Sequence, residues 1–404
     1  MESGHDAGSG PDPGPRPDAA EAARAGGSRP DASFHGHLFE SDAAGDAASR
    51  AGETAGFVRE RFQSREIAQV LSHYDLGVIR EIREYRRGSR RAAKLKISAD
   101  GGDFLLKRRA LGRSLERDRE RAAAGHAVQH RAAAGGVPVA GLVPLRSGGT
   151  LLQFGERLYE LHGWVEGERY DRHAEQARSA GVGLARMHAA FARLELLEEL
   201  PQGGFTDIDG VRHALELGTQ RAFERTPADG RAQLAASIDA IRAHVDRVEA
   251  KLAVKGLPLQ PSAICHGDFH PGNTLWSGDQ LVAVIDFDSV RYEAIAAEVA
   301  NAMLQFSVRH RKGEDPLRWP IGLVSENLRG FAAGYARDSA APTRVMAPFI
   351  PWLMLSAIVA EAMSPIARDG DFAGIPAEPF LQATVRMMDW ISERTRAISA
   401  TLEI

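Results

Sequence analysis

Three polar residues near position 270 have the types and spacing needed to hold a metal ion beside a reacting hydroxyl group. Asp268 and Asn273 stand five residues apart in an irregular segment that contains Pro271 and Gly272, and Asp286 follows an apolar run. Carboxylate and amide oxygens suit Mg²⁺, which takes few protein ligands and completes its shell with water and phosphate oxygens. We therefore expect Asn273 and Asp286 to bind Mg²⁺, and Asp268 to lie nearby without binding it.

The sequence around these residues predicts a β-hairpin that brings them together. Two apolar, strand-favouring runs, 274–276 and 281–285, are separated by four polar residues with turn chemistry. A hairpin folds back on itself, so Asp286 at the end of the second strand returns to the level of Asn273 at the start of the first. The pattern therefore predicts a metal-binding hairpin within residues 264–290.

The order of these residues indicates phosphoryl transfer. In that chemistry one carboxylate orients the attacking hydroxyl group, while an Asn and an Asp hold magnesium. Protein kinases carry His-x-Asp, four residues, Asn and later Asp-Phe-Gly in the same order. This chain has the same order, but Asp288 stands where the final glycine would be.

With that departure, His-Gly-Asp-Phe-His-Pro-Gly-Asn and the later Ile-Asp-Phe-Asp resemble the aminoglycoside phosphotransferase and choline kinase superfamily. Within it, the motifs are most similar to those of homoserine-kinase-II-like and spore-coat-kinase-like members. The resemblance covers residues 57–404 and is most specific in 264–290. It implies an α+β, bilobal, protein-kinase-like fold, with a small antiparallel-sheet N-lobe, a larger mainly α-helical C-lobe, and ATP and Mg²⁺ as cofactors.

The resemblance also implies roles for single residues. Asp268 is expected to be catalytic, and His266 is expected to brace the loop as a structural residue at the site. Asn273 and Asp286 are expected to hold metal. Asp288 either helps to hold a second metal ion or caps a helix expected to begin near Tyr292.

A different hypothesis for the same segment is a hydrolase metal site. His266, Asp268 and His270 occupy alternate positions, and a strand would place such side chains on one face. That hypothesis leaves Pro271, Gly272 and the second aspartate motif unexplained. We therefore favour phosphoryl transfer.

Composition limits the other classes of function. The chain has 404 residues, is 44% hydrophobic and carries a formal net charge of −4, and it shows no basic stripe of the kind that nucleic acid binding needs. Its single cysteine, Cys265, fits a reducing compartment.

Residues 1–56 are rich in Gly, Ala, Pro and Asp and lack a basic, apolar signal segment, so we expect a disordered tail. The uncharged stretch 345–360 is too short to span a membrane and predicts a buried helix. We expect a cytoplasmic protein that binds neither nucleic acid nor a membrane. The sequence does not determine its oligomeric state.

Residues 57–163 form the expected N-lobe, and Lys107 is its candidate phosphate-binding residue. A helix is expected in 57–73, followed by strands in 78–85, 93–98 and 102–107. By resemblance, the lysine on the third strand pairs nucleotide phosphates. The alternative is that Lys107 to Arg109 form a solvated basic edge, and Arg108 and Arg109 are expected to face solvent. Gly88 and Ser89 lie where a loop covering the phosphates would be.

The expected partner of Lys107 is a residue on a polar helix over 114–134. Glu116, Glu120 and His126 are the three candidates, and the sequence does not decide between them. A further hairpin over 150–162 leads to the stretch 163–167, where the resemblance places the hinge whose backbone meets adenine. Glu160 and His162, near the end of that hairpin, are therefore expected to be cofactor-binding residues.

Residues 164–404 form the expected C-lobe. Helical patterns cover 174–197, 234–252, 292–311, 319–335, 351–363 and 380–402. His188 is expected to be a hydrogen-bonded core histidine. Glu298, Asn301 and Gln305 share a helical face and either line a substrate pocket or form a polar contact between helices.

The sequence therefore predicts an ATP-dependent phosphotransferase that moves the γ-phosphate to a hydroxyl of a small amino alcohol, amino acid or sugar-like acceptor. The alternative is a catalytically inactive nucleotide-binding or scaffolding module. A protein kinase is disfavoured because helix is expected soon after Asp288, which leaves little room for an activation segment.

Overall fold

The computed structural model describes most of the chain beyond residue 60. Apart from Met1, the described ranges are 61–85, 92–110, 112, 114–192, 194, 200–256, 261–309, 315–340 and 342–403. Residues 2–56 of the expected tail, and the expected phosphate-covering residues Gly88 and Ser89, lie outside these ranges.

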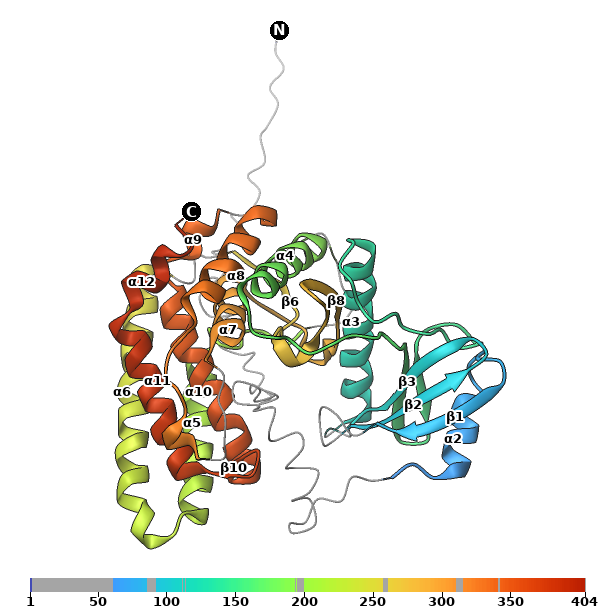
Figure 1. Cartoon of the computed structure of the whole chain (residues 1–404), viewed down its shortest axis with the longest axis horizontal. Helices are drawn as coiled ribbons and strands as arrows, with labels where there is room; N and C mark the ends of the chain where they lie inside the picture. Colours follow the sequence, from blue (N-terminus) through green and yellow to red (C-terminus); the bar gives the residue numbers. More distant parts are fainter. Residues whose placement is uncertain are drawn as a thin grey trace. The chain divides into compact units, whose positions relative to one another are not determined.

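The N-terminal part is built on a five-stranded antiparallel sheet with the strand order β1-β2-β3-β5-β4 (Figure 1). Its elements are α2 (Ser64–Leu71), β1 (Ile79–Glu84), β2 (Ala93–Ala99), β3 (Gly102–Arg108), α3 (Leu115–Ala134), β4 (Leu151–Phe154) and β5 (Arg157–Gly163). The predicted strands and helix α3 are confirmed, while the helix expected over 57–73 is described only as the shorter α2. The Ser114 side chain accepts a hydrogen bond from the Arg117 N–H, and this cap starts α3.

Apolar residues of the sheet and α2 form a core of their own. Leu95 and Ile97 alternate with partly exposed residues along β2, as expected for a strand with one buried face. They pack with buried residues from neighbouring elements, among them Val70 of α2, Leu106 of β3 and Leu161 of β5. This cluster, which we call the sheet core, fixes the register in which β3 and β5 face each other.

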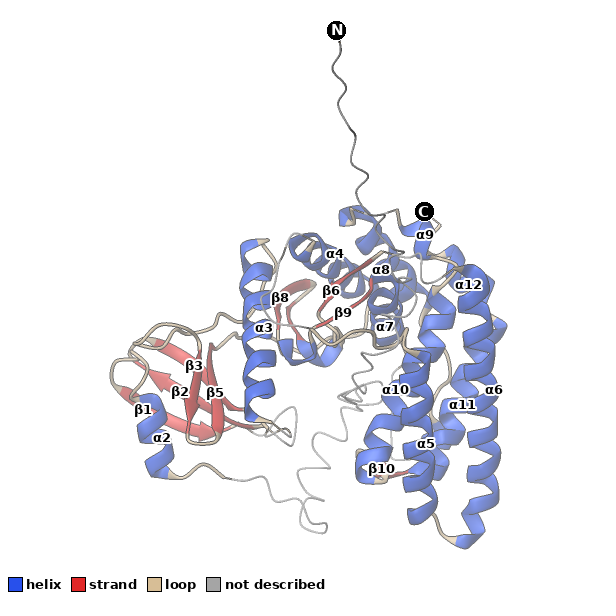
Figure 2. Ribbon diagram, turned by 180° about the vertical axis from the view of Figure 1, so that it is seen from behind, coloured by secondary structure: helices blue, strands red, loops and turns tan. Residues whose placement is uncertain are grey.

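The C-terminal part is mainly helical, as Figure 2 shows in blue. Its helices are α4 (Ala174–Phe191), α5 (Ile208–Arg225), α6 (Arg231–Lys255), α7 (Ile295–Ser307), α8 (Ser325–Asp338), α9 (Thr343–Met346), α10 (Ile350–Asp369), α11 (Ala377–Glu393) and α12 (Thr395–Ala400). Short strand pairs join β6 (Ser262–Cys265) to β9 (Arg291–Ala294), β7 (Thr274–Ser277) to β8 (Gln280–Val284), and β10 (Asp371–Phe372) to β11 (Ile375–Pro376). A second and larger apolar cluster, the helical core, runs through these helices and reaches α3.

Close helix packing in this part depends on glycine. A Cβ added at Gly181 of α4 would overlap the Phe331 carbonyl oxygen of α8, and one added at Gly334 of α8 would overlap the Arg178 carbonyl oxygen of α4. The missing side chains therefore let the two helices approach until backbone meets backbone.

Two expected helices begin later than predicted. Residues 291–294 form strand β9, which pairs with β6, so α7 starts at Ile295 rather than near Tyr292. The helix expected from Trp319 begins at Ser325. Pairing with a distant strand overrides the local helical pattern at β9, and such pairing is invisible to periodicity.

Helix α10 is the buried apolar helix expected from the uncharged stretch 345–360. The stretch is divided, since Val345 is 46% exposed in the short helix α9 and α10 begins at Ile350. Pro351 lies in the first turn of α10, where it costs no helical hydrogen bond. Within the described residues, α10 is the one helix long and apolar enough to cross a membrane, and 89% of its most apolar window is buried inside the protein.

Candidate active site

The predicted hairpin is present and places Asn273 and Asp286 together. Thr274 lies opposite Val284 in the β7–β8 pair, and the Ile285 N–H donates to the Asn273 carbonyl oxygen at 3.0 Å. One hydrogen bond beyond the strands thus ties the end of β8 to the start of β7. Asp286 follows directly and has a positive φ of 65°, so its backbone turns sharply into the 3₁₀ turn Phe287–Ser289.

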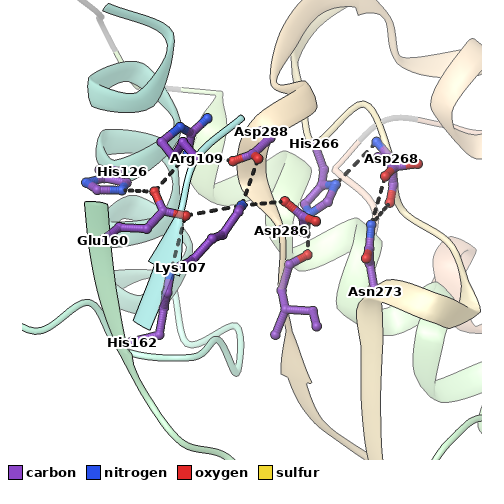
Figure 3. Close-up of polar contacts among 11 residues, drawn as sticks. Lys107, Arg109, His126, Glu160, His162, His266, Asp268, Asn273, Asp286 and Asp288 are labelled. Carbon is purple, nitrogen blue, oxygen red and sulfur yellow. Dashed lines mark hydrogen bonds and ion pairs between the residues drawn. The ribbon is translucent and has the colours of Figure 1, made fainter. Parts of the chain in front are cut away.

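Asn273 holds Asp268 by two hydrogen bonds. Its Nδ2 donates to the Asp268 main-chain oxygen at 3.0 Å and to the Asp268 Oδ2 at 2.9 Å (Figure 3). Because Nδ2 supplies both bonds, Oδ1 is the atom of this amide that can ligate a metal ion. Asp268 is buried, with a relative exposure of 5%, so its carboxylate is held in a site that excludes most water.

His266 links this loop to the hairpin. Its Nδ1 accepts the Asp268 N–H at 3.3 Å, and its Nε2 lies 3.2 Å from the Ile285 carbonyl oxygen. A ring that accepts at Nδ1 and donates at Nε2 is a neutral imidazole. Burial lowers the pKa of His266, which is consistent with that form. The contacts match the bracing role expected for it.

Glu298 of α7 supports the loop from the other side. Its two carboxylate oxygens accept the backbone N–H groups of His266, at 3.3 Å, and Gly267, at 2.6 Å. Its Oε2 also lies 2.7 Å from Nε2 of His188 on α4, so His188 is a hydrogen-bonded core histidine as expected. Burial opposes ionisation of Glu298, but these partners outweigh it and lower its pKa. Glu298 is therefore a loop support.

A second buried support comes from β9. Arg291 donates from Nη2 to the Gly267 carbonyl oxygen at 2.8 Å and pairs with Glu293 at 2.9 Å. The Thr206 N–H donates to the same glutamate at 3.0 Å. The sequence analysis did not select Arg291 or Glu293, because residues 291–294 are strand only through pairing with β6.

Lys107 of β3 reaches the hairpin carboxylates. Its Nζ lies 3.1 Å from Glu160, 3.1 Å from Asp286 and 2.7 Å from Asp288. Burial alone would lower the pKa of Lys107, but the three carboxylates raise it, so the ammonium group is charged. The ammonium group lies between the carboxylates of Asp286 and Asp288, so oxygens of both aspartates converge on one position.

Arg109 also lies in this cluster, which corrects the expectation that Arg108 and Arg109 face solvent. The Arg109 Nη1 lies 2.7 Å from Glu160 and 2.7 Å from Asp288, and its side chain is only 12% exposed. Arg108 is buried on the other side of the strand, where it pairs with Glu66 at 2.7 Å. Alternation along β3 could have revealed this, because residues two apart share a face.

Glu160 of β5 is the sheet residue that pairs with Lys107, which corrects the expectation that this partner is Glu116, Glu120 or His126 on α3. At Glu160 the backbone of β5 pairs with β3 on one side and with β4 on the other. The Glu160 side chain is therefore the group that faces the site. His126 of α3 binds Glu160 at 2.9 Å, and His162 lies 3.3 Å from it. The other two candidates, Glu116 and Glu120, are exposed on α3.

Asp288 lies within the 3₁₀ turn Phe287–Ser289 and faces Lys107 and Arg109, as Figure 3 shows. Strand β9 separates it from α7, so it does not cap that helix. Of the two roles considered for it, capping is excluded, and its carboxylate lies with that of Asp286 at the Lys107 ammonium group.

Cys265 ends strand β6 directly before this loop and is fully buried. Its Sγ lies within 4.8 Å of ligand atoms of His188 and Glu298. Those two residues are already hydrogen-bonded to each other, and burial, followed by the charges of Glu298 and Glu293, raises the pKa of the thiol well above its ordinary value. The thiol is therefore protonated. The three residues Cys265, His188 and Glu298 form a hydrogen-bonded support rather than a metal centre.

Comparison with known proteins agrees with this geometry. The sequence profile of the phosphotransferase enzyme family matches residues 81–346, which is more than half of the chain and includes the loop, the hairpin and Lys107. The chain belongs to the phosphotransferase enzyme family.

Curated proteins that are similar to this chain include two homoserine kinases. The enzyme of Rhizobium etli (strain CIAT 652) is 31% identical over 159 residues, and that of Rhizobium johnstonii (strain DSM 114642 / LMG 32736 / 3841) is 30% identical over 162 residues. Each match covers 39% of this chain and 44% of the relative. The chain thus matches less than half the length of these relatives.

Solved structures share the fold at low identity. An aminoglycoside phosphotransferase from Alicyclobacillus acidocaldarius subsp. acidocaldarius DSM 446 has a TM-score of 0.58 at 14% identity, covering 87% of this chain and 97% of its own. An amicoumacin kinase in complex with AMP-PNP and Ca²⁺ has 0.57 at 12%, covering 83% and 94%. A microcompartment-associated aminopropanol kinase has 0.56 at 16%, covering 83% and 99%. The bilobal, α+β, kinase-like fold of this family member is thereby established.

Proposed function

We propose that this chain is an ATP-dependent small-molecule kinase, which transfers the γ-phosphate of ATP to an acceptor hydroxyl group. The observation that carries the proposal is the juxtaposition of Asp268, fixed by Asn273, with the two carboxylates of Asp286 and Asp288 and the ammonium group of Lys107. Phosphoryl transfer requires an oriented hydroxyl group and neutralised phosphates, and these are the groups that provide them.

Asp268 acts on the acceptor. Its carboxylate accepts the hydrogen of the acceptor hydroxyl group and orients the oxygen toward the γ-phosphorus. A bond forms between that oxygen and the phosphorus, the bond to the bridging oxygen of the β-phosphate breaks, and ADP leaves. The hydroxyl proton passes to Asp268.

The hairpin is proposed to hold Mg²⁺. Asn273, through Oδ1, and the carboxylates of Asp286 and Asp288 are the ligands, and a bound ion would neutralise phosphate charge. Lys107 clamps the phosphates from β3, and the stretch after His162 borders the adenine. Gly88 and Ser89 are proposed to cover the phosphates, and His266 keeps the loop in register with the hairpin.

The acceptor is proposed to be an amino alcohol, an amino acid or a sugar-like molecule. Homoserine kinases, an aminopropanol kinase and an aminoglycoside phosphotransferase are similar to this chain, and all are named for small acceptors. A protein acceptor fits less well, because only Ser289 and Val290 lie between Asp288 and strand β9, which leaves no room for an activation segment. A cytoplasmic location is proposed from the single, buried and protonated cysteine.

The test is ADP release from Mg·ATP with a panel of hydroxyl compounds that includes homoserine, aminopropanol, ethanolamine and aminoglycosides. We expect acceptor-dependent turnover in the wild type and a loss of roughly 10²-fold or more in Asp268→Ala and in Asn273→Ala. Asp279→Asn is the matched control, because Asp279 is an exposed aspartate in the β7–β8 turn, with 60% of its side chain accessible.

Two results would count against the proposal. Tight ATP binding without turnover for any acceptor would support an inactive nucleotide-binding module instead. Turnover that survives in Asp268→Ala would remove the proposed role of this carboxylate.

A further inference from the structure

We propose that Arg109 is a second phosphate-binding cation of the nucleotide site, held beside Lys107 by the shared carboxylate of Glu160. This inference rests on the proposed function, since it assigns a further residue to the same site. It is carried by strand geometry, by the contacts of Glu160 and by the charge of the cluster.

Strand geometry places Arg109 on the same face as Lys107. The Arg109 N–H donates to the Leu158 carbonyl oxygen at 2.9 Å, so the pairing with β5 continues beyond the last residue of β3. Residues two apart on a strand point to the same side. Arg108, between them, points to the opposite side, where its guanidinium lies 4.5 Å from the centre of the Phe62 ring and pairs with Glu66. Lys107 and Arg109 thus face Glu160, whereas Arg108 faces Glu66 on the opposite side of the strand.

Glu160 holds both site cations at once. It lies directly opposite Lys107 in the β3–β5 pair, its Oε1 is 3.1 Å from Lys107, and its Oε2 is 2.7 Å from Arg109. Its side chain is only 2% exposed. Burial opposes ionisation of Glu160, but Lys107 and Arg109 outweigh it and lower its pKa, so the carboxylate is charged.

Helix α3 reaches Glu160 through His126 rather than reaching the lysine. In protein kinases the strand lysine pairs with a glutamate carried by a helix. Here His126 binds Glu160 through Nε2 at 2.9 Å and Thr150 through Nδ1 at 2.8 Å. The helix therefore braces the carboxylate through His126, and the carboxylate, which is carried by β5, contacts two cations of β3.

The charge of the cluster favours an anion beside these cations. Lys107 and Arg109 are balanced by Glu160, Asp286 and Asp288. The two aspartates are the proposed metal ligands, and a divalent ion at them would take over the carboxylates that Lys107 and Arg109 contact. Glu160 alone would then face two cations, which leaves one uncompensated positive charge. A guanidinium suits phosphate because its planar donors can bind two oxygens together.

The experiment is equilibrium binding of ATP and of adenosine to the full chain in the presence of Mg²⁺, measured by calorimetry. We expect Arg109→Gln to weaken ATP binding roughly 10- to 100-fold, the range for a lost hydrogen bond to a charged group, and to leave adenosine binding unchanged. Arg109→Lys, which keeps the charge but lacks the planar pair of donors, should recover part of the affinity for ATP. Arg108→Gln is the control, since it removes the neighbouring cation outside the site.

The outcomes separate this inference from the proposed function. Selective weakening of ATP binding in Arg109→Gln supports the inference, whether or not an acceptor is phosphorylated. Absence of phosphorylation for every acceptor would overturn only the kinase proposal. ATP binding at the wild-type level in Arg109→Gln, or equal weakening of ATP and adenosine, overturns the inference. A wild type that binds no ATP overturns both.

Discussion

Glu298 supports the loop that carries Asp268 through the backbone. It accepts hydrogen bonds from two consecutive backbone N–H groups of the loop between β6 and β7 and pairs with His188. The buried carboxylate of Glu298 therefore fixes the path of the backbone directly before Asp268. Three partners hold the pKa of this carboxyl below its ordinary value even though burial acts in the opposite direction.

We predict that Glu298→Gln lowers the free energy of unfolding by about 1–3 kcal/mol at pH 7, because a buried charged acceptor is lost. The lowered pKa in the folded state means that the unfolded chain binds more protons as the pH falls below 4.5. The stabilisation by Glu298 is thus fully present above that pH and is lost as the pH falls through the lowered folded pKa.

Urea unfolding of the wild type and of Glu298→Gln at pH 7, 5 and 4 measures this difference. The gap between the two proteins should stay constant from pH 7 to pH 5 and shrink toward pH 4. A gap that widens with acid would show that the carboxyl is protonated in the folded protein.

At the residue scale, the sequence revealed the groups that belong to a contiguous motif. Asp268, Asn273 and Asp286 could be found because a loop and a hairpin set their spacing locally. Arg109 and Arg291 were missed, because their significance depends on partners that lie far away along the chain, at Glu160 and Gly267.

Among the elements, the loop between β6 and β7 carries the tightest constraint. Gly267 has a φ of +80°, which favours glycine, and a Cβ there would overlap the Ser289 carbonyl oxygen in the turn that carries Asp288. Loop and turn therefore touch backbone to backbone, and this contact fixes the distance between the loop of Asp268 and the turn of Asp288.

We predict that Gly267→Ala costs about 2–4 kcal/mol of unfolding free energy and lowers kcat by at least 10-fold, because the loop must move away from the turn. Gly278→Ala is the matched control. Gly278 also has a positive φ, of +56°, but a Cβ there meets open space, so we expect a cost of about 1 kcal/mol and unchanged kcat.

Thermal unfolding and steady-state kinetics of the two variants test this prediction. Equal losses of stability and activity in both would mean that strain in the backbone, rather than the contact with Ser289, is responsible.

Element types were more predictable than element boundaries. The β7–β8 hairpin and most strands of the sheet follow from apolar runs and turn residues that act over a few positions, and α3 was expected as a polar helix. Strand β9 did not, because its four residues are strand only through pairing with β6, and helix α5 was not predicted.

For the whole molecule, the main fact is that apolar residues form two separate clusters. The sheet core includes Ile97 of β2, and the helical core includes Leu353 of α10. Lys107 and Arg109 connect the sheet to the hairpin through ion pairs instead of apolar packing. The two-part architecture was predictable from the motifs, whereas the number and pairing of the C-terminal helices were not, because they arise from contacts between distant segments.

We predict that the two clusters respond separately to cavity-forming substitutions. Ile97→Ala and Leu353→Ala remove fully buried side chains and should each cost about 2–5 kcal/mol. Native-state hydrogen exchange should speed up mainly in β1 to β5 for Ile97→Ala and mainly in α10 and its neighbours for Leu353→Ala. Mg·ATP, which would bind residues of both parts, should slow exchange in both. Identical exchange patterns in the two variants would show that the two cores unfold as one unit.

Cys265 gives this protein a built-in chemical reporter. It is the single cysteine of the chain, it is fully buried, and its protonated thiol lies at the end of β6, directly before the loop that carries Asp268. A thiol reagent can therefore modify the native protein only when β6 separates from its surroundings. The rate of labelling would time the opening of this one strand, and every modified molecule would carry its tag directly before His266.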